Sequence, residues 1–238
     1  QKLTGVFVTE PSDASSTNCF DQMNLTWDEE ILSVANIPLS YFPKVVASTS
    51  IIGGLTKEAA AHTGLNVGTP VVAGGGDGPM AALGAGIIKP SDGAYACMGS
   101  SSWVAVSTDK PLHDSKMRSM TWNHIVPNQF SPTATMQAGG ASLQWIVEDL
   151  MPVTEKDRYK ILLSEAEKVK SSDDGLYFLP HILGERSPYW NPSAAGAFIG
   201  LGRHHDRSYL VRAVLEGVAF NLLTCIQAFT DNGVPIKQ

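Results

Sequence analysis

The chain has 238 residues, of which 43% are hydrophobic and 17% are charged, a balance typical of a soluble globular protein with one or two domains. Its 17 Lys and Arg residues against 23 Asp and Glu residues give a net charge of -6. No basic surface for a nucleic acid or an acidic membrane is therefore indicated, and a small-molecule partner is expected instead.

The three cysteines, Cys19, Cys97 and Cys225, are widely spaced, which favours a reducing compartment and predicts a cytoplasmic protein. The most apolar stretch, 210–229, is interrupted by charged and amide side chains, so we expect no membrane span. The chain opens on Gln1 without the pattern of a signal peptide, and we expect that it begins within a longer protein.

Residues 1–86 predict a loop, two short helices, a strand and a third helix. Thr26 and Glu29 have the spacing of a capping box ahead of the first helix, and Thr56 is placed to cap the second. The β-branched run at 69–73 predicts the strand, which three consecutive glycines stop before the third helix begins near Pro79.

Residues 89–93 have the composition of a linker, so we place a domain boundary here, with one domain at 1–88 and a second at 89–238. The order of elements predicted beyond it, βββαβα, is typical of the start of a ribonuclease-H-like domain, an α/β fold with mixed sheets flanked by helices. The predicted elements are strands at 94–98, 103–107 and 130–136, a helix at 141–150, a helix capped by Thr154, a strand at 176–179 and a helix at 207–230.

The first glycine turn reads Val-Val-Ala-Gly-Gly-Gly-Asp-Gly-Pro over 71–79, so three positions without side chains precede one carboxylate, that of Asp77. A ligand can approach such a backbone closely, and ligands of open α/β sheets bind at the carboxyl ends of strands. Asp77 is therefore a candidate site residue. By local pattern alone, capping of the following helix is the commoner role for such an aspartate.

The same turn allows a second interpretation. Gly76, Gly78 and Ala81 fit GxGxxA, the phosphate-binding fingerprint of a dinucleotide domain, which would make the protein an oxidoreductase. Two features oppose it, because Pro79 lies inside the turn and the strand at 94–98 ends without the acidic residue that a ribose hydroxyl requires.

A second glycine turn, Gly99-Ser100-Ser101-Ser102, lies between two predicted strands and offers N–H groups and hydroxyls to a phosphate, although Gly and Ser are also common in ordinary hairpins. Gly139-Gly140 opens a helix, whose N-terminus is expected to carry unpaired N–H donors suited to nucleotide phosphates. Gln144 lies one turn inside that helix, where a surface glutamine is the usual case.

Charged residues follow the predicted strand at 176–179. The adjacent Glu185 and Arg186 favour a structural ion pair in a loop, with a ligand-facing loop as the alternative. His204 and His205 precede Asp206, and capping of the last helix by Asp206 is favoured over a metal site because no third ligand has suitable spacing.

Several different short motifs are spread along nearly the whole chain. They are Thr4-Gly5, Ser12-Asp13-Ala14-Ser15, Ile52-Gly53, Thr63-Gly64-Leu65, the run 68–77, Ala82-Leu83-Gly84-Ala85-Gly86, Gly184-Glu185-Arg186-Ser187-Pro188, the run 196–201 and the run 210–220. In this order and spacing they resemble the FGGY family of carbohydrate kinases, and most of all its xylulokinase branch.

The resemblance implies two ribonuclease-H-like domains of the actin and hexokinase type, with a sugar and ATP meeting in the cleft between them. It implies that Asp77 is the catalytic base and that Gly78 lies at the substrate, since phosphoryl transfer needs a carboxylate to accept the proton of the acceptor hydroxyl. The residues implied in ATP binding are Gly99, Ser100, Ser101, Gly140 and Gln144. Mg²⁺ is the implied metal, with no ligands assigned in this chain.

The sequence departs from the family pattern in three respects. Ser102 replaces a Gly of the family's phosphate motif and would be strained if that position requires a positive φ, and Gly78 replaces an Asn that often touches the sugar. The family's N-terminal phosphate loop and its C-terminal adenosine motif have no counterpart here, so we expect this chain on its own to be inactive.

The expected activity of the intact protein is phosphorylation of a sugar hydroxyl by ATP, with D-xylulose as the leading substrate. Ribulose, gluconate and glycerol stay open as substrates. A dinucleotide-dependent oxidoreductase and a non-catalytic sugar-binding protein are the alternatives from other classes. The sequence leaves the oligomeric state open, with a homodimer as one option.

Overall fold

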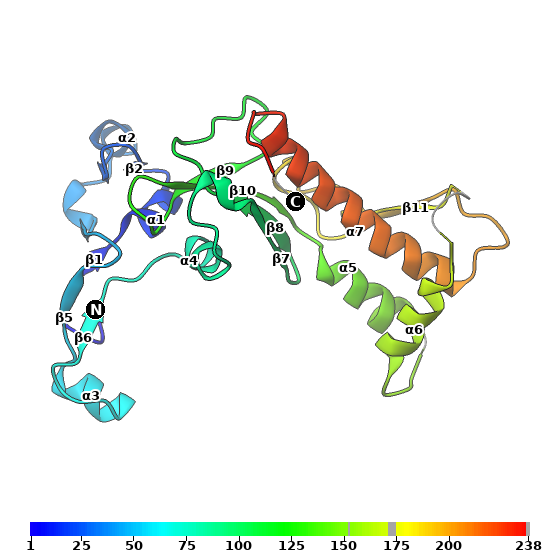
Figure 1. The fold of residues 1–238 in the computed structure, drawn as a ribbon, viewed down its shortest axis with the longest axis horizontal. Coiled ribbons are helices and arrows are strands. Elements are labelled where there is room, and N and C mark those ends of the chain that lie inside the picture. Colours follow the sequence, from blue (N-terminus) through cyan, green and yellow to red (C-terminus); the bar gives the residue numbers. More distant parts are fainter. Residues whose placement is uncertain (152, 171–174, 237–238) are drawn as a thin grey trace. The chain divides into compact units, whose positions relative to one another are not determined.

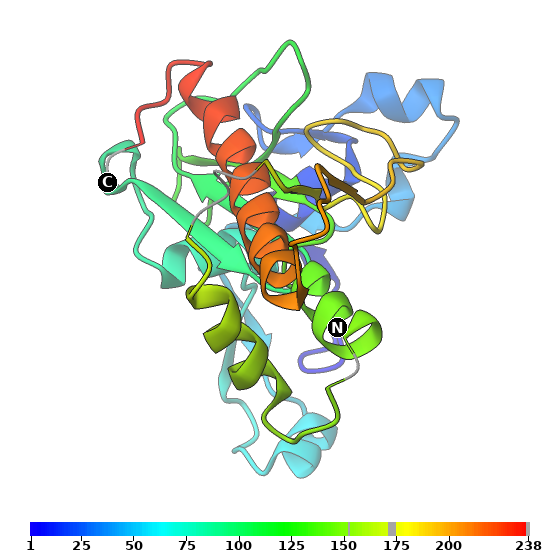
Figure 2. The same cartoon turned by 90° about the vertical axis from the view of Figure 1, so that its right-hand side faces the viewer.

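The computed structural model describes residues 1–151, 153–170 and 175–236, and its ribbon is drawn from two directions in Figures 1 and 2. The chain divides into two compact units. Unit 1 comprises Gln1–Gly93, Val106–Leu112 and Thr121–Pro132, and unit 2 comprises Ala94–Ala105, His113–Met120 and Thr133–Gln238.

Unit 1 is built from short elements. In chain order they are β1 (Val8–Thr9), α1 (Pro11–Ala14), η1 (Ser15–Thr17), β2 (Phe20–Asp21), β3 (Thr26–Trp27), α2 (Glu29–Val34), η2 (Leu39–Tyr41), β4 (Lys44–Val45), β5 (Ile51–Gly54), α3 (Lys57–Thr63), β6 (Pro70–Val72), α4 (Asp77–Gly84) and η3 (Pro90–Asp92). β1 pairs in parallel with β4, whereas β2 with β3 and β5 with β6 pair in antiparallel fashion.

Two helix caps in unit 1 test the sequence prediction. The Thr56 side chain accepts a hydrogen bond from a backbone N–H in the first turn of α3, and Gly64 ends that helix with φ at 74°, so this prediction is confirmed. The predicted capping box at Thr26 is wrong. Thr26 lies in β3, and Asp28 caps α2 instead, because its carboxylate stands directly before the helix and accepts from Ile31 N at 2.9 Å.

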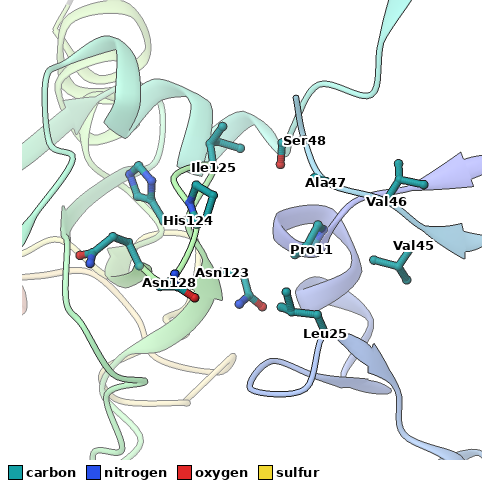
Figure 3. A pocket seen from close by; sticks show the side chains of 12 residues that line it. Pro11, Leu25, Val45, Val46, Ala47, Ser48, Asn123, His124, Ile125 and Asn128 are labelled. Atoms are coloured by element: carbon teal, nitrogen blue, oxygen red, sulfur yellow. The ribbon is translucent and has the colours of Figure 1, made fainter. Parts of the chain in front are cut away.

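A pocket of about 210 Å³ lies within unit 1, between the segments 45–48 and 123–129 (Figure 3). Its histidine, His124, is held by two backbone groups, because Nε2 lies 2.9 Å from Ile87 O and Nδ1 accepts from Val126 N at 2.9 Å. Burial lowers the pKa of His124. Backbone groups engage both ring nitrogens. The imidazole therefore serves the fold of unit 1.

The largest sheet contains β7 (Ala94–Met98), β8 (Ser102–Val106), β10 (Phe130–Met136) and β9 (Met120–Asn123), in that order, with β8 and β10 antiparallel. The predicted strands at 94–98 and 130–136 are confirmed, and the one at 103–107 is shifted by one residue. β9 was not predicted. The division between the two units passes through β8, β9 and β10.

The remaining elements belong to unit 2. They are α5 (Gly140–Trp145), a π-helical turn η4 (Ile146–Leu150), α6 (Arg158–Glu167), β11 (Tyr177–Leu179), β12 (Ala197–Ile199) and α7 (Arg207–Thr230). Thr154 does not cap α6, which begins after Asp157 without a side-chain cap. Asp206 caps α7 as predicted, accepting from Ser208 N at 2.9 Å.

The core of unit 2 forms where α7 packs against α5, α6 and β11, as Figures 1 and 2 show. By length and composition α7 is able to cross a membrane. Nine of its residues are nevertheless buried, and Val211 and Val214 lie in the same apolar cluster as Leu162 and Phe178. An internal ion pair, Arg212 to Glu216 at 2.6 Å, covers part of its surface. We therefore interpret α7 as the core helix of unit 2.

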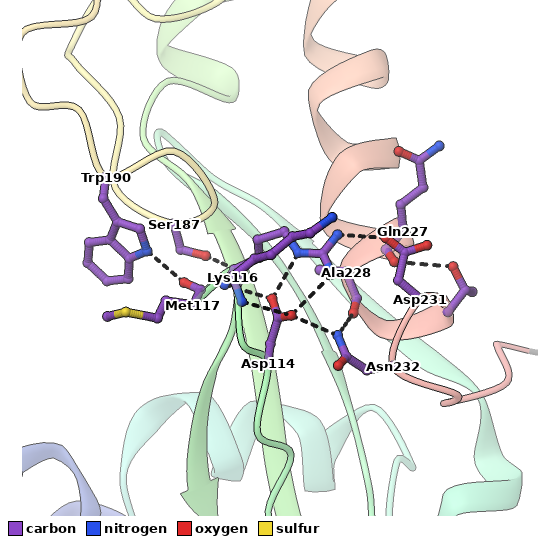
Figure 4. A network of polar contacts seen from close by, with 11 residues as sticks. Asp114, Lys116, Met117, Ser187, Trp190, Gln227, Ala228, Asp231 and Asn232 are labelled. Atoms are coloured by element: carbon purple, nitrogen blue, oxygen red, sulfur yellow. Dashed lines mark hydrogen bonds and ion pairs between the residues drawn. The ribbon is translucent and has the colours of Figure 1, made fainter.

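A polar network anchors the C-terminal end of α7 (Figure 4). The Arg118 guanidinium lies 2.8 Å from Asp114 and 2.7 Å from Asp231, and Asn232 donates to Asp114 at 3.1 Å. These hydrogen bonds, above all the one from Arg118, hold the pKa of Asp114 well below its usual range. The segment around Arg118 is thereby tied to the helix end.

Candidate active site

Asp77 is the first residue of α4, and its side chain is exposed. The N-cap position is Gly76, so Asp77 is not the N-cap that the local pattern favoured. Within the described residues, its carboxylate forms one hydrogen bond, from Gly78 N to Oδ1 at 2.8 Å. Asp77 Oδ2 is left to accept a proton or hydrogen bond from a ligand.

The glycine turn before Asp77 is held by two hydrogen bonds that its backbone amides donate. Gly74 N donates to Ser48 O at 3.0 Å, and Gly76 N donates to the Ser12 hydroxyl at 2.9 Å. Gly74 has φ at 84°, a conformation that side chains disfavour. The turn is thus fixed at both ends, immediately before the carboxylate.

The dinucleotide interpretation of this turn is not supported by the strand pairing. A dinucleotide-binding βαβ unit needs its two strands to be parallel and in one sheet. Among the described strands, β6, which precedes the turn, pairs only with β5, in antiparallel fashion. β7, which follows α4, lies in another sheet.

In unit 2, two of the sequence motifs come together. Gly140 N donates to Gly99 O at 2.8 Å, and Ala141 N donates to Ser100 O at 3.1 Å, so the β7–β8 turn lies against the start of α5. A Cβ on Gly140 would lie 2.6 Å from Gly99 O, a separation that real Cβ atoms essentially never show. Glycine at 140 is therefore required for this close approach of two turns.

The hydrogen bonds at this junction change which groups are available to a phosphate. The first amides of α5, which the sequence predicted to be unpaired donors, are engaged with Gly99, Ser100 and Gly139 carbonyls. By contrast, the hydroxyls of Ser100 and Ser101 form no hydrogen bond within the described residues, and Ser100 is exposed. These hydroxyls lie beside Gly99 and Gly140, which carry no side chains, and they are available to donate hydrogen bonds to a ligand.

Ser102 differs from the sequence expectation, whereas Gln144 is the surface glutamine that the local pattern favours. Ser102 is fully buried in β8 and is not among the residues with positive φ, so the expected strain is absent at this described residue. Gln144 is exposed, but its Nε2 already donates to Glu148 at 3.1 Å, one helical turn further on. That hydrogen bond holds the Gln144 side chain along the surface of α5 and η4.

The loop that contains Glu185 forms a buried polar cluster. Glu185 is 2% exposed and accepts hydrogen bonds from Gln137 N at 2.8 Å, His181 Nδ1 at 3.2 Å and Asn221 Nδ2 at 3.1 Å. The predicted pair with Arg186 reduces to a contact from the Arg186 backbone N–H. Because Gln137 precedes Gly139 and Gly140, Glu185 supports the start of the junction with the β7–β8 turn.

No cluster of three or more His, Cys, Asp or Glu side chains in the part of the chain that the structure describes is arranged to hold a metal ion. We assign none of the described residues to Mg²⁺.

Sequence reasoning missed a buried carboxylate behind the first glycine turn. Glu10 is 3% exposed and accepts hydrogen bonds from the hydroxyls of Ser12 and Ser48, the two residues that hold that turn. A signal was present, because Glu10 is followed by Pro11, and Pro is favoured at the first position of a helix. That signal predicts a cap at Glu10 but not its link to Ser48.

Two family comparisons cover almost the whole chain. Residues 1–84 match the N-terminal domain of the FGGY family of carbohydrate kinases, and residues 94–238 match its C-terminal domain. The chain belongs to the FGGY family of carbohydrate kinases. The resemblance based on the short motifs is thereby confirmed. The chain has the ribonuclease-H-like fold of the actin and hexokinase type.

Relatives of this FGGY chain carry two different substrate names. It is 36% identical to a gluconokinase of Bacillus licheniformis over 242 residues, covering 97% of this chain and 46% of that protein. It is also 36% identical to a xylulose kinase of Lactococcus lactis over 220 residues, covering 92% of this chain and 43% of that protein. The chain thus spans just under half the length of these curated relatives.

The solved structures agree with this assignment of fold. The crystal structure of a xylulose kinase from Rhodospirillum rubrum superposes on the FGGY chain with a TM-score of 0.86 at 32% identity. The match covers 99% of this chain and 47% of that one.

Proposed function

We propose that the full-length product of the reading frame encoding this chain transfers the γ-phosphoryl group of ATP to a hydroxyl of an open-chain sugar. The observation that carries the proposal is the exposed carboxylate of Asp77 directly after a bare glycine turn, in a chain of the FGGY family. Residues 1–88 would belong to the sugar-binding domain and residues 89–238 to the nucleotide-binding domain.

In this proposal Asp77 Oδ2 accepts the proton of the acceptor hydroxyl while its oxygen forms a bond to the γ-phosphorus and ADP leaves. Gly78 N keeps the carboxylate oriented through Oδ1. A Cβ on Gly78 would meet nothing within 4 Å, so this position leaves room for the acceptor beside Asp77.

The junction of the two turns in unit 2 would hold the nucleotide. Ser100 and Ser101 hydroxyls donate to phosphate oxygens, Gly99 and Gly140 allow the phosphates to approach the backbone, and Gln144 lines the nucleotide from α5. Mg²⁺ offsets phosphate charge in such transfers when it is bound, and no step here is assigned to it.

D-xylulose, converted to D-xylulose 5-phosphate, is the leading acceptor, supported by the motif pattern and by the xylulose kinase relatives. Gluconate is the second candidate, because a gluconokinase is equally similar to the chain. The free thiols Cys19, Cys97 and Cys225 support a cytoplasmic location. The net charge of -6 supports small-molecule partners rather than a nucleic acid or a membrane. The oligomeric state that we propose is a homodimer.

A coupled assay of ADP release tests this function. The full-length product is assayed with ATP and a panel of D-xylulose, D-ribulose, gluconate and glycerol, and a reaction without acceptor measures background hydrolysis. We expect the highest kcat/KM with D-xylulose. A higher kcat/KM with gluconate would transfer the proposal to the second candidate, and ADP release that no acceptor stimulates would refute a sugar kinase.

A further inference from the structure

A buried carboxylate lies behind the glycine turn that presents Asp77. Glu10 accepts hydrogen bonds from Ser12 N at 2.9 Å, Ser12 Oγ at 2.6 Å, Asp13 N at 2.7 Å and Ser48 Oγ at 2.7 Å. Glu10 is 3% exposed, and no described Lys, Arg or His forms an ion pair with it. Burial of a polar side chain is costly unless hydrogen bonds satisfy it, and these four donors offset the cost of burying Glu10.

Three of the four donors belong to Ser12 and Ser48, the two residues that hold the turn. Ser12 Oγ accepts from Gly76 N at 2.9 Å, and Ser48 O accepts from Gly74 N at 3.0 Å. Both serines are buried, and Ser48 lies at the edge of the pocket in Figure 3. One carboxylate therefore joins the two attachment points of the turn.

The polarity of this chain of hydrogen bonds depends on the carboxylate. A serine hydroxyl has a single proton, and that of Ser12 is donated to Glu10 Oε1. The lone pairs of Ser12 Oγ are thus left to accept from Gly76 N, one residue before Asp77.

We propose that Glu10 is a positioning residue, which fixes the Asp77 carboxylate for proton transfer through Ser12 and the amide of Gly76. The proposal rests on the proposed function of Asp77. An amide at position 10 cannot substitute, because Oε1 faces Asp13 N–H and Oε2 faces Ser12 N–H. A glutamine would place its NH₂ group against a backbone donor in either orientation.

The test compares two alanine substitutions of buried serines in the full-length product. Ser12→Ala removes the link from Glu10 to Gly76. Ser15→Ala is the matched control, because its hydroxyl bonds Pro11 O at 2.6 Å and Asn123 Oδ1 at 2.9 Å and does not touch the turn. We expect Ser12→Ala to lower kcat by about tenfold or more with KM for ATP unchanged, and Ser15→Ala to leave kcat within about twofold.

A second pair of variants separates positioning from loss of structure. If Ser12 acts through Asp77, then Ser12→Ala causes no further loss of kcat in an Asp77→Asn background. Ser48→Ala keeps the Ser48 O bond to Gly74 but removes a donor to Glu10, and it replaces Ser12→Ala if that variant does not fold. We expect it to lower kcat in the same direction, and again only when Asp77 is present.

Two results would overturn the role of Glu10 but leave the role of Asp77 intact. One is a kcat for Ser12→Ala equal to that of Ser15→Ala. The other is a fold-loss of kcat from Ser12→Ala that is as large in the Asp77→Asn background as in the unaltered protein. A third result is distinguishable from both. Unchanged turnover in Asp77→Asn itself would refute the proposed role of Asp77 and this proposal with it.

Discussion

Replacing Gly217 in the middle of α7 by alanine is expected to destabilise the protein, against the usual helix preference. In an open helix the change would stabilise by about 1 kcal/mol, because glycine loses more backbone entropy than alanine. Gly217 is buried against β11, however, and an added Cβ would lie 2.2 Å from Phe178 O and 3.1 Å from Phe178 C. Both are backbone atoms, which cannot move aside as a side chain does.

Relief of this overlap requires α7 and β11 to move apart. The ring of Phe178 packs against those of Trp145 and Phe198, with ring centroids 6.0 Å and 4.7 Å away respectively. The movement therefore also disturbs the aromatic packing of the core. Overpacking costs about 1–3 kcal/mol, and an overlap with backbone atoms belongs in the upper part of that range, about 2–3 kcal/mol, which exceeds the gain of about 1 kcal/mol in helix preference. We expect a net loss of about 1–2 kcal/mol.

Thermal unfolding of the full-length product, followed by circular dichroism, measures the effect. A loss of 1 kcal/mol corresponds to a fall in Tm of roughly 2–4 °C for a domain of this size. Gly84→Ala is the control, because Gly84 lies at the end of α4 with nothing within 4 Å of an added Cβ, and its Tm should be unchanged or raised. A Tm for Gly217→Ala equal to or above that of the unaltered protein would refute the packing argument.

Two further predictions concern unit 2. Gly140→Ala would force apart the two turns that meet at Gly99 O. The Kd for ATP, measured by calorimetry, should rise about tenfold or more, while the Kd for the sugar stays unchanged. An unchanged Kd for ATP would exclude the junction as the nucleotide site. Arg118→Met leaves Asp114, whose side chain is 2% exposed, without its main donor and should cost about 1–3 kcal/mol near pH 7. The folded-state pKa of Asp114 is lowered, so the stabilisation is present above the ordinary aspartate pKa of about 3.9 and is lost as pH falls below it. The urea midpoints of the variant and the unaltered protein should therefore converge in acid. A constant difference between the two midpoints down to about pH 2 would contradict this linkage.

Elements with a clean local pattern were predictable from the sequence. α7 was predicted at its observed bounds, because a long apolar periodicity begins directly after the capping residue Asp206. β9 was missed, since Met-Thr-Trp-Asn is only four residues long and is stabilised by its place beside β10 rather than by alternation. The caps at Thr26 and Thr154 failed because a neighbouring aspartate occupies the cap position in each case.

The candidate site divides in the same way. The sequence predicted Asp77 and both glycine turns, since a run of glycines directly after a strand marks a place where the backbone is left open to a ligand. It did not predict the joining of Ser12, Ser48 and Gly76 through Glu10, because those contacts connect residues far apart in the chain. Nor did it predict the hydrogen bond from Gln144 to Glu148, since the sequence offers a surface glutamine several possible hydrogen-bond partners.

The central claim is that the Asp77 carboxylate takes the proton of the hydroxyl that receives phosphate. The most direct measurement is the turnover of full-length Asp77→Asn with sugar and ATP, beside its Kd for ATP. Loss of a general base predicts a fall in kcat of about 100- to 10,000-fold, with the Kd for ATP within about twofold of the unaltered protein. Turnover close to that of the unaltered protein would contradict the account.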